Sequence, residues 1–252
     1  MLLNDKSRYG TRLQHRDPLV LEKISLDSRL LIVEGISGSG KDTFQTYLKK
    51  ELRGRDLYDY SEGELLLSWN HLLIRGIFKL QVQLMKLFVR YVSEILSREE
   101  NAVFLLNRFH LSAYVLEITK QPKLEREYDA IVNTLRTLPV HVFILELDEN
   151  EIATRSLHPE RSSAWQKFQQ QIVEREGFRD RIERYLWQQR LMLDTAEKQQ
   201  IPYSVIKFPF AAEIGRGRIR VLETQTNLHH EVRTNTADTK VSRRKRDLPQ
   251  AL

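Results

Sequence analysis

The sequence of 252 residues contains no cysteine, so a disulfide framework and a thiolate metal site are both excluded. It also lacks an uncharged apolar run of about 20 residues, the length that a membrane-spanning helix requires. Its richest apolar stretch, residues 64–98, is interrupted by the charged residues Arg75, Lys79, Lys86, Arg90 and Glu94. The N-terminal residues show no apolar segment of the kind found in secretory signals. We therefore expect a cytoplasmic protein with no membrane partner.

The positive charge of the chain is concentrated at one end. The sequence has a net charge of +6, and residues 211–252 hold nine basic against five acidic side chains. The tail therefore carries +4 and the rest of the chain only +2. Scattered apolar residues among many polar ones predict that 211–252 is disordered. Its basic run SRRKRD (242–247) is short and has no interleaved aromatic residues, so nucleic acid is not the expected partner.

Short apolar segments alternate with helical patterns from Arg29 onward. The pattern predicts strands at 29–34, 56–61, 102–107, 140–147 and 202–207, and helices at 41–53, 64–99, 110–118, 124–137, 149–156 and 165–199. Such alternation predicts an α/β fold with a doubly wound, parallel, five-stranded sheet. We expect an N-terminal extension (1–28), one folded domain (29–210) and the basic tail (211–252).

A glycine-rich motif, G-x-x-x-x-G-K, follows the first expected strand and opens a helix. In that context the motif is typical of a loop whose backbone N–H groups surround phosphates, with the helix N-terminus adding positive potential. The alternative is a tight turn that binds nothing. The strand, the glycine spacing and the lysine together favour a nucleotide site. Its expected members are Gly35, Ser37, Gly38, Ser39, Gly40, Lys41, Asp42 and Thr43.

Asp42 is unusual, because a Ser or Thr is expected after the lysine of such a loop. The hydroxyl at this position is normally a ligand of Mg²⁺. A carboxylate can bind Mg²⁺ directly or through water, so Asp42 is a candidate metal ligand. Alternatively, Thr43 supplies the hydroxyl while Asp42 stabilises the helix N-terminus.

Three arginines are candidates for catalysis. Arg108 follows the third expected strand and can bind an acceptor phosphate or stabilise the transferring group, although it can also pair with an acid. Arg155 and Arg161 flank His158 in a polar segment between two helices, which can close over a triphosphate as a lid. Lys41 and these three arginines form the expected catalytic set. The alternative for the lid arginines is a solvated charged turn.

Glu62, Glu64 and Trp69 follow the second expected strand. A carboxylate at this strand end can orient a hydroxyl group of an acceptor or accept its proton. Trp69 can form one wall of a base pocket. With Arg108 they are the expected substrate-binding residues. The alternative is a helix N-terminus rich in acids, followed by a core tryptophan.

These motifs together resemble the thymidylate kinase family, and more loosely the wider nucleoside and nucleotide kinases. The family loop, F-E-G-x-D-G-S-G-K-T/S-T, is similar to V-E-G-I-S-G-S-G-K-D-T at 33–43. Its D-R-Y/H motif is similar to Asn107-Arg108-Phe109, and the following Ser and A-Y to Ser112-Ala113-Tyr114. The strand that ends in Asp before A-x-x-R resembles 147–155, and F-x-x-R-(V/I)-x-x-x-Y resembles 178–185, with its Tyr one place early.

The resemblance spans about 29–208 and implies a P-loop kinase domain with a helical lid. It further implies ATP and Mg²⁺ as cofactors, transfer of the γ-phosphoryl group to a nucleoside monophosphate, and a homodimer. The sequence departs from the family where Ser37 and Asn107 replace acids and where Ser61-Glu62-Gly63 replaces an R-E-P motif. The spacing of Glu64 and Trp69 instead resembles that of deoxynucleoside kinases.

The sequence therefore predicts an ATP-dependent kinase that acts on a small acceptor, a nucleoside monophosphate or a nucleoside. A nucleotide-binding regulatory module whose catalysis has decayed is the main alternative, favoured by Ser37 and Asn107. A nucleic-acid-associated ATPase recruited through 242–247 is a third reading.

Overall fold

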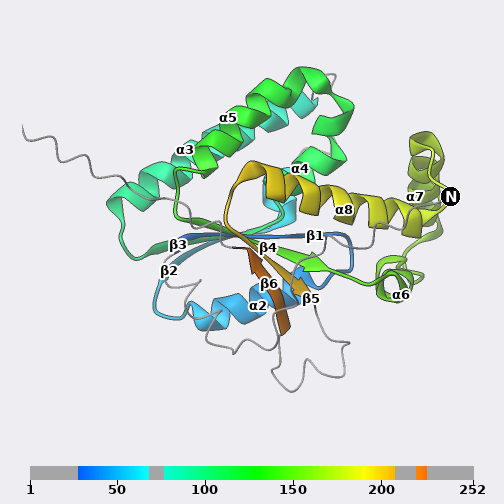
Figure 1. Cartoon of the computed structure of the whole chain (residues 1–252), viewed down its shortest axis with the longest axis horizontal. Helices are drawn as coiled ribbons and strands as arrows, with labels where there is room; N and C mark the ends of the chain where they lie inside the picture. The colour runs from blue at the N-terminus through cyan, green and yellow to red at the C-terminus, as the bar shows by residue number, and fades with distance from the viewer. Residues whose placement is uncertain (1–27, 68–76, 208–219, 226–252) are drawn as a thin grey trace, which may run out of the picture.

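The computed structural model describes residues 28–67, 77–207 and 220–225 (Figure 1). Trp69, nearly all of the expected N-terminal extension and most of the expected tail lie outside these residues. Within the described ranges, no helix combines the length and the apolar character that crossing a membrane requires.

Five parallel strands form the centre of the sheet: β1 (Leu30–Gly35), β2 (Asp56–Tyr60), β3 (Ala102–Asn107), β4 (Val140–Glu146) and β5 (Tyr203–Lys207). Their order is β2-β3-β1-β4-β5. The three middle strands are buried almost throughout, as their unbroken apolar sequences require, whereas β2 is partly exposed. The predicted α/β fold with a five-stranded parallel sheet is confirmed.

A sixth strand, β6 (Arg220–Gln225), pairs antiparallel with β5. It lies inside the segment 211–252 that we expected to be disordered, so that expectation is wrong for these six residues. The physical reason is that β5, as the last parallel strand, presents an edge of unpaired backbone groups that an added strand can satisfy. The mixed composition of the segment 211–252 gave no sign that these six residues pair as a strand.

Helices cover both faces of this sheet (Figure 1). The longer ones are α2 (Lys41–Glu51), α3 (Ile77–Arg98), α4 (His110–Leu116), α5 (Glu125–Leu135), α7 (Ser163–Glu176) and α8 (Arg181–Gln199). The short turns are η1 (Gly63–Leu67), η2 (Ile118–Lys120), η3 (Pro122–Leu124), α6 (Glu149–Glu151) and η4 (Ile152–Ser156). Phe44 and Leu48 of α2 pack on one face against Val33 and Phe143. Helices α3, α4, α5 and α8 lie on the other face.

The helix predicted over 165–199 is two helices, α7 and α8, so that prediction is wrong in the middle. Gly177 ends α7 in the left-handed conformation (φ 77°), which glycine adopts without steric cost. The side chain of Asp180 then accepts a hydrogen bond from the Glu183 backbone N–H (2.8 Å) and starts α8. The break places α7 at the far end of α8, away from the sheet (Figure 1).

Candidate functional site

The register of the sheet brings three loops to one edge. Val33 of β1 lies opposite Asn107 of β3, and Gly35 lies opposite Leu145 of β4. Because these strands are parallel, their carboxyl ends meet at the same edge, where α/β folds bind ligands. The glycine loop, residues 107–108 and residues 147–148 therefore adjoin one another.

The glycine loop has the backbone conformation that its sequence predicts. Gly38 and Gly40 adopt φ values of 75° and 90°, and α2 begins directly afterwards at Lys41. A Cβ atom on Gly38 would lie 2.6 Å from the carbonyl oxygen of Arg155, so this position requires glycine for a second reason. The segment η4, which we expected to be part of a lid, thus packs directly on the loop.

Lys41 is buried inside this loop. Its Nζ donates a hydrogen bond to the Ile36 carbonyl oxygen (2.8 Å), and only 7% of the residue is exposed. Burial, together with the nearby Arg108, lowers the pKa of Lys41 to about 7, against the opposing effect of Glu62 and Asp42. Such an ammonium group lacks solvation and has a strong electrostatic preference for an anionic partner.

Asp42 contacts Asn107, the residue that ends β3. The Asn107 Nδ2 donates a hydrogen bond to the Asp42 Oδ1 (2.6 Å) across 65 residues of sequence. In the described part of the chain, the buried Asn107 Oδ1 has no hydrogen-bond partner, and neither has the buried Ser39 Oγ. Thr43 lies exposed one residue further along α2. The loop therefore carries one accessible carboxylate beside an unused carbonyl oxygen.

Glu34 is a structural member of the site to which sequence reasoning gave no role. Its carboxylate is fully buried and accepts hydrogen bonds from the backbone N–H groups of Phe109 (2.9 Å) and Leu111 (3.0 Å). It also accepts two bonds from Ser112, and burial raises its pKa above the ordinary value. The signal was a single carboxylate in an apolar strand, which must be hydrogen-bonded to be buried. Glu34 fixes the turn that carries Arg108.

Arg108 and Glu62 form an ion pair across the site. Arg108 Nη1 lies 2.8 Å from Glu62 Oε1, and the two side chains are 12% and 25% exposed. Arg108 also has a φ of 62°, an uncommon conformation for a residue with a side chain. Pairing with an acid was one of the two roles that we considered for Arg108, and in the structure Arg108 pairs with Glu62. Its buried Nε has no hydrogen-bond partner among the described residues.

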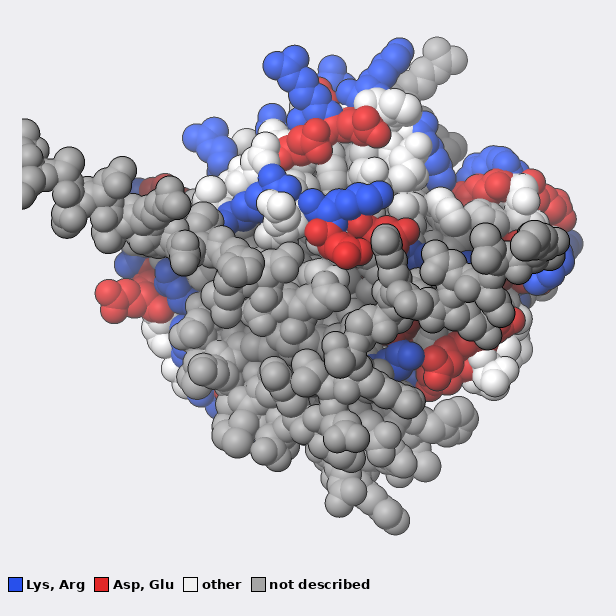
Figure 2. Space-filling model, in the orientation of Figure 1, with Lys and Arg blue, Asp and Glu red and all other residues white. Residues whose placement is uncertain are grey.

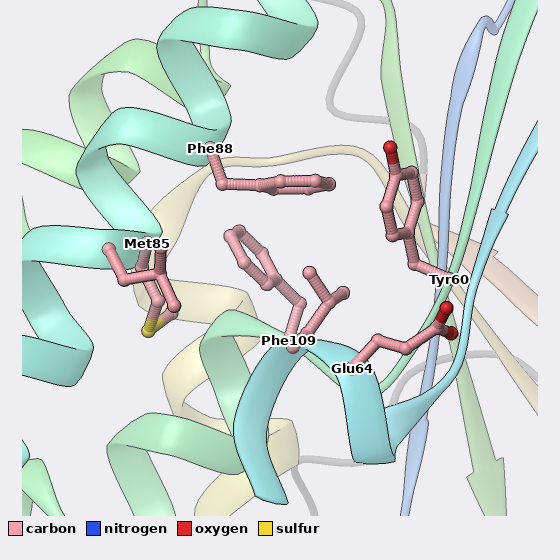
Figure 3. A pocket seen from close by; sticks show the side chains of 7 residues that line it. Tyr60, Glu64, Met85, Phe88 and Phe109 are labelled. Atoms are coloured by element: carbon pink, nitrogen blue, oxygen red, sulfur yellow. The ribbon is translucent and has the colours of Figure 1, made fainter. Parts of the chain in front are cut away.

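Phe109, next to Arg108 in the chain, and Tyr60 and Glu64, two residues on either side of Glu62, line a small apolar pocket of about 160 Å³ (Figure 3). Its lining residues are Tyr60, Glu64, Leu65, Leu84, Met85, Phe88 and Phe109. The Glu64 carboxylate accepts hydrogen bonds from the Ser61 backbone N–H (2.7 Å) and hydroxyl (2.6 Å), which lower its pKa. Trp69, the expected pocket wall, lies outside the described residues.

The two lid arginines occupy different positions. Arg155, in η4, lies 3.7 Å from Glu151, and its backbone carbonyl approaches Gly38. The guanidinium carbon of Arg161 lies 6.0 Å from the ring centroid of Trp165 at the start of α7. Arg155 is therefore at the loop, whereas Arg161 lies over the Trp165 ring of α7.

His158 links the lid to the loop, a contact that sequence reasoning missed. Its Nε2 lies 3.2 Å from the Ser37 Oγ, and its Nδ1 lies 3.1 Å from the Glu160 carboxylate. His158 has a φ of 49°, again in the left-handed region. Because 121 residues separate Ser37 from His158, the spacing in the sequence gave no signal for this contact.

No protein-family model matches the sequence, and no curated protein matches it. Among solved structures, the thymidylate kinase from Ehrlichia chaffeensis shares 18% identity with a TM-score of 0.45, covering 75% of this chain and 93% of that one. The thymidylate kinase from Candida albicans shares 15% identity with a TM-score of 0.45, covering 72% of this chain and 84% of that one. Both belong to the family that the sequence motifs resemble. A likeness of this extent does not transfer an activity.

Proposed function

We propose that this protein is an ATP-dependent kinase that transfers the γ-phosphoryl group to a small acceptor, a nucleoside monophosphate or a nucleoside. The observation that carries the proposal is the buried ammonium group of Lys41, held at the start of α2 inside a glycine loop. A polyphosphate entering the loop supplies the negative charge that this group lacks.

The residues of the chain supply positioning and charge. The N–H groups of the loop hold the β- and γ-phosphates, and Lys41 contacts their oxygen atoms. Because the pKa of Lys41 is about 7 without an anion, a bound triphosphate raises the pKa and keeps the group charged. Arg108 acts from the acceptor side, and Arg155 and Arg161 from the lid, to stabilise charge on the transferring group.

The same loop fits Mg²⁺, which prefers oxygen ligands. Asp42 offers an exposed carboxylate, and the neighbouring Asn107 keeps a buried carbonyl oxygen without a hydrogen-bond partner in the described structure. We assign the ion to Asp42, with the hydroxyl of Thr43 as the alternative ligand. When bound with ATP, Mg²⁺ neutralises charge on the phosphate oxygens.

The test is ADP formation from ATP with a panel of nucleosides, nucleoside monophosphates and other small alcohols or phosphates. We expect Lys41→Ala to lower kcat by about 100-fold or more, since it removes a cation that stabilises the transition state. The matched control is Lys50→Ala, because Lys50 is exposed on the same helix. Unchanged turnover in Lys41→Ala, with circular dichroism showing an intact fold, would refute the assignment.

A regulatory module that binds ATP without turnover is the second candidate. Asn107 favours it, because an amide at the strand end cannot accept a proton or bind a metal as an anion. ATP binding measured by calorimetry, together with no turnover on any acceptor of the panel, would establish this candidate.

One face of the molecule bears on whether nucleic acid is a partner. On the face shown in Figure 2, basic and acidic side chains alternate over the upper helices, whereas nucleic-acid binding gathers basic side chains into a stripe. The basic run 242–247 lies outside the described residues.

We also propose that the protein forms a homodimer through α3. Leu80, Leu87 and Tyr91 of this helix are 49%, 61% and 40% exposed. Their spacing of seven and four residues places them on one side of the helix. Exposed apolar side chains gathered in this way mark interaction surfaces. The cytoplasmic location stays a prediction from composition.

A further inference from the structure

Resting on the proposed kinase function, we propose that the acceptor is an uncharged, ring-bearing alcohol, such as a nucleoside, and not a phosphate monoester. Two observations support this: the ion pair of Arg108 with Glu62 and the apolar lining of the pocket. An arginine that binds an acceptor phosphate must have its guanidinium group available to that phosphate. In this structure the guanidinium group already has a partner.

The Arg108–Glu62 pair is held firmly. The two side chains are mostly buried at a separation of 2.8 Å, and the backbone N–H of Arg108 donates to the Val33 carbonyl oxygen (2.9 Å). The bonds from α4 to Glu34 fix the same turn. Separating this partly buried pair would leave each charge without its partner. A phosphate could reach Arg108 only by displacing Glu62 or by lying against its negative charge.

The charged residue among those that line the pocket in the described structure is a carboxylate. Glu64 lines the pocket, and its two hydrogen bonds from Ser61 lower its pKa and keep it ionised. No Lys or Arg is among the described residues that line the pocket. A phosphate dianion would be repelled here, whereas a neutral hydroxyl group can donate to a carboxylate.

The pocket itself suits a flat ring. Its volume of about 160 Å³ is well below the roughly 300 Å³ of small ligand-binding pockets, so it takes one part of an acceptor. Phe88 is 5.0 Å from Tyr60 and 5.7 Å from Phe109, between ring centroids, at steep interplanar angles. Figure 3 shows these three rings around the pocket, with the Glu64 carboxylate at its edge. A base or similar ring would pack against them by aromatic contacts.

The pair has a direct use in the transfer. The acceptor hydroxyl oxygen attacks the γ-phosphorus, and its proton passes to the Glu62 carboxylate. The bond between the γ-phosphorus and the β,γ-bridging oxygen breaks, and ADP leaves with the electron pair. Once Glu62 is protonated, Arg108 loses its anionic partner and becomes available to the new phosphate ester. The proton on Glu62 then returns to solvent. The charges of Arg108 and Glu62 both affect the pKa of Lys41, so the pair lies near the phosphate loop.

The experiment compares nucleosides with their own 5′-monophosphates as acceptors, with ADP formation as the rate and phosphorus NMR identifying the product. We expect kcat/KM to be at least about 100-fold higher for a nucleoside than for its monophosphate, as expected when a site excludes a charge that it cannot pair. Calorimetric affinities of both acceptors for the wild-type protein give a second readout that needs no variant.

Glu62→Gln sharpens the test, because it removes the charge and keeps the shape. We expect it to lower kcat for the nucleoside by about 100-fold through loss of the proton acceptor, and to tighten monophosphate binding about tenfold by freeing Arg108. Glu94→Gln is the matched control, since its ion pair with Arg98 is exposed on α3 and Glu94 is not among the residues that line the pocket.

Turnover with monophosphates alone, or a Glu62→Gln variant with unchanged preference, would overturn the inference and leave the kinase proposal standing. Absence of turnover by the wild-type protein with every acceptor would overturn both the inference and the kinase proposal.

Discussion

At the scale of single residues, the contact between Asp42 and Asn107 decides where the negative charge of the loop lies. The family that the sequence resembles has a hydroxyl residue where this chain has Asp42, and an acid where this chain has Asn107. The Asn107 Nδ2 lies 2.6 Å from the Asp42 Oδ1, so the carboxylate of this contact belongs to Asp42 and not to residue 107.

We therefore predict that Asp42→Ser weakens binding of Mg²⁺ or Mn²⁺ by about tenfold or more, the usual effect of losing a group at a metal site. Adding Asn107→Asp should restore most of that affinity, because the carboxylate returns to the same contact. Calorimetry with a non-hydrolysable ATP analogue measures this without turnover, and coupling between the two changes is the decisive quantity. If the double variant binds metal as poorly as Asp42→Ser alone, Asp42 only stabilises the helix N-terminus.

The backbone of the glycine loop was predictable from its sequence, because its glycines and the start of α2 lie within seven consecutive residues. The pairings that complete the site were not. Arg108 meets Glu62 across 46 residues, and His158 meets Ser37 across 121. Strand order and turn geometry decide which polar residues at the strand ends face each other. Neither can be inferred from the spacing of residues in the sequence.

At the scale of elements, the end of α4 carries a carboxylate that makes stability depend on pH. Glu117 ends α4, near Glu176 of α7, which pairs with Lys120 (2.7 Å) and Arg184 (2.6 Å). Burial raises the pKa of Glu117 to about 7; Lys120 opposes this rise and Glu176 adds to it. The folded protein therefore binds a proton more tightly than the unfolded chain does, so the contribution of Glu117 to stability is largest below pH 4.5 and declines up to pH 7.

We predict that Glu117→Gln raises the melting temperature at pH 8 by about 2–4 °C, equivalent to about 1 kcal/mol for a partly exposed group, and has little effect at pH 4.5. Differential scanning fluorimetry of both proteins at the two pH values measures this. Glu125→Gln, an exposed change at the start of α5, is the control. The same pH dependence in wild type and Glu117→Gln would show that another group is responsible.

The elements themselves followed from the alternation of apolar segments, and their type and order were predicted correctly over the parallel sheet. The misses have local causes. A single glycine at 177 splits the helix predicted over 165–199, although the apolar pattern continues through it. The strand β6 has two apolar residues, Val221 and Leu222, so no apolar run marked it as a strand.

At the scale of the whole molecule, the exposed side of α3 bears on how two copies associate. One side of this helix packs into the core through Val82, Met85 and Val89. The other side exposes Leu87 more than any other large apolar residue of the described structure, with Leu80 and Tyr91 one or two turns away. Water-exposed apolar area of this kind is stabilised by burial against a second copy, at about 25 cal/mol per Å².

We predict that the protein is a dimer in solution and that Leu87→Arg makes it a monomer, because a charge at the centre of an apolar interface has no partner when buried. Light scattering coupled to size exclusion measures the mass directly, over a range of concentrations. Phe168→Arg is the matched control: Phe168 is 57% exposed but lies on the lid helix α7, so its change should leave the dimer intact. A monomeric wild type would show that α3 serves another partner, and dissociation by both variants would place the interface at the lid.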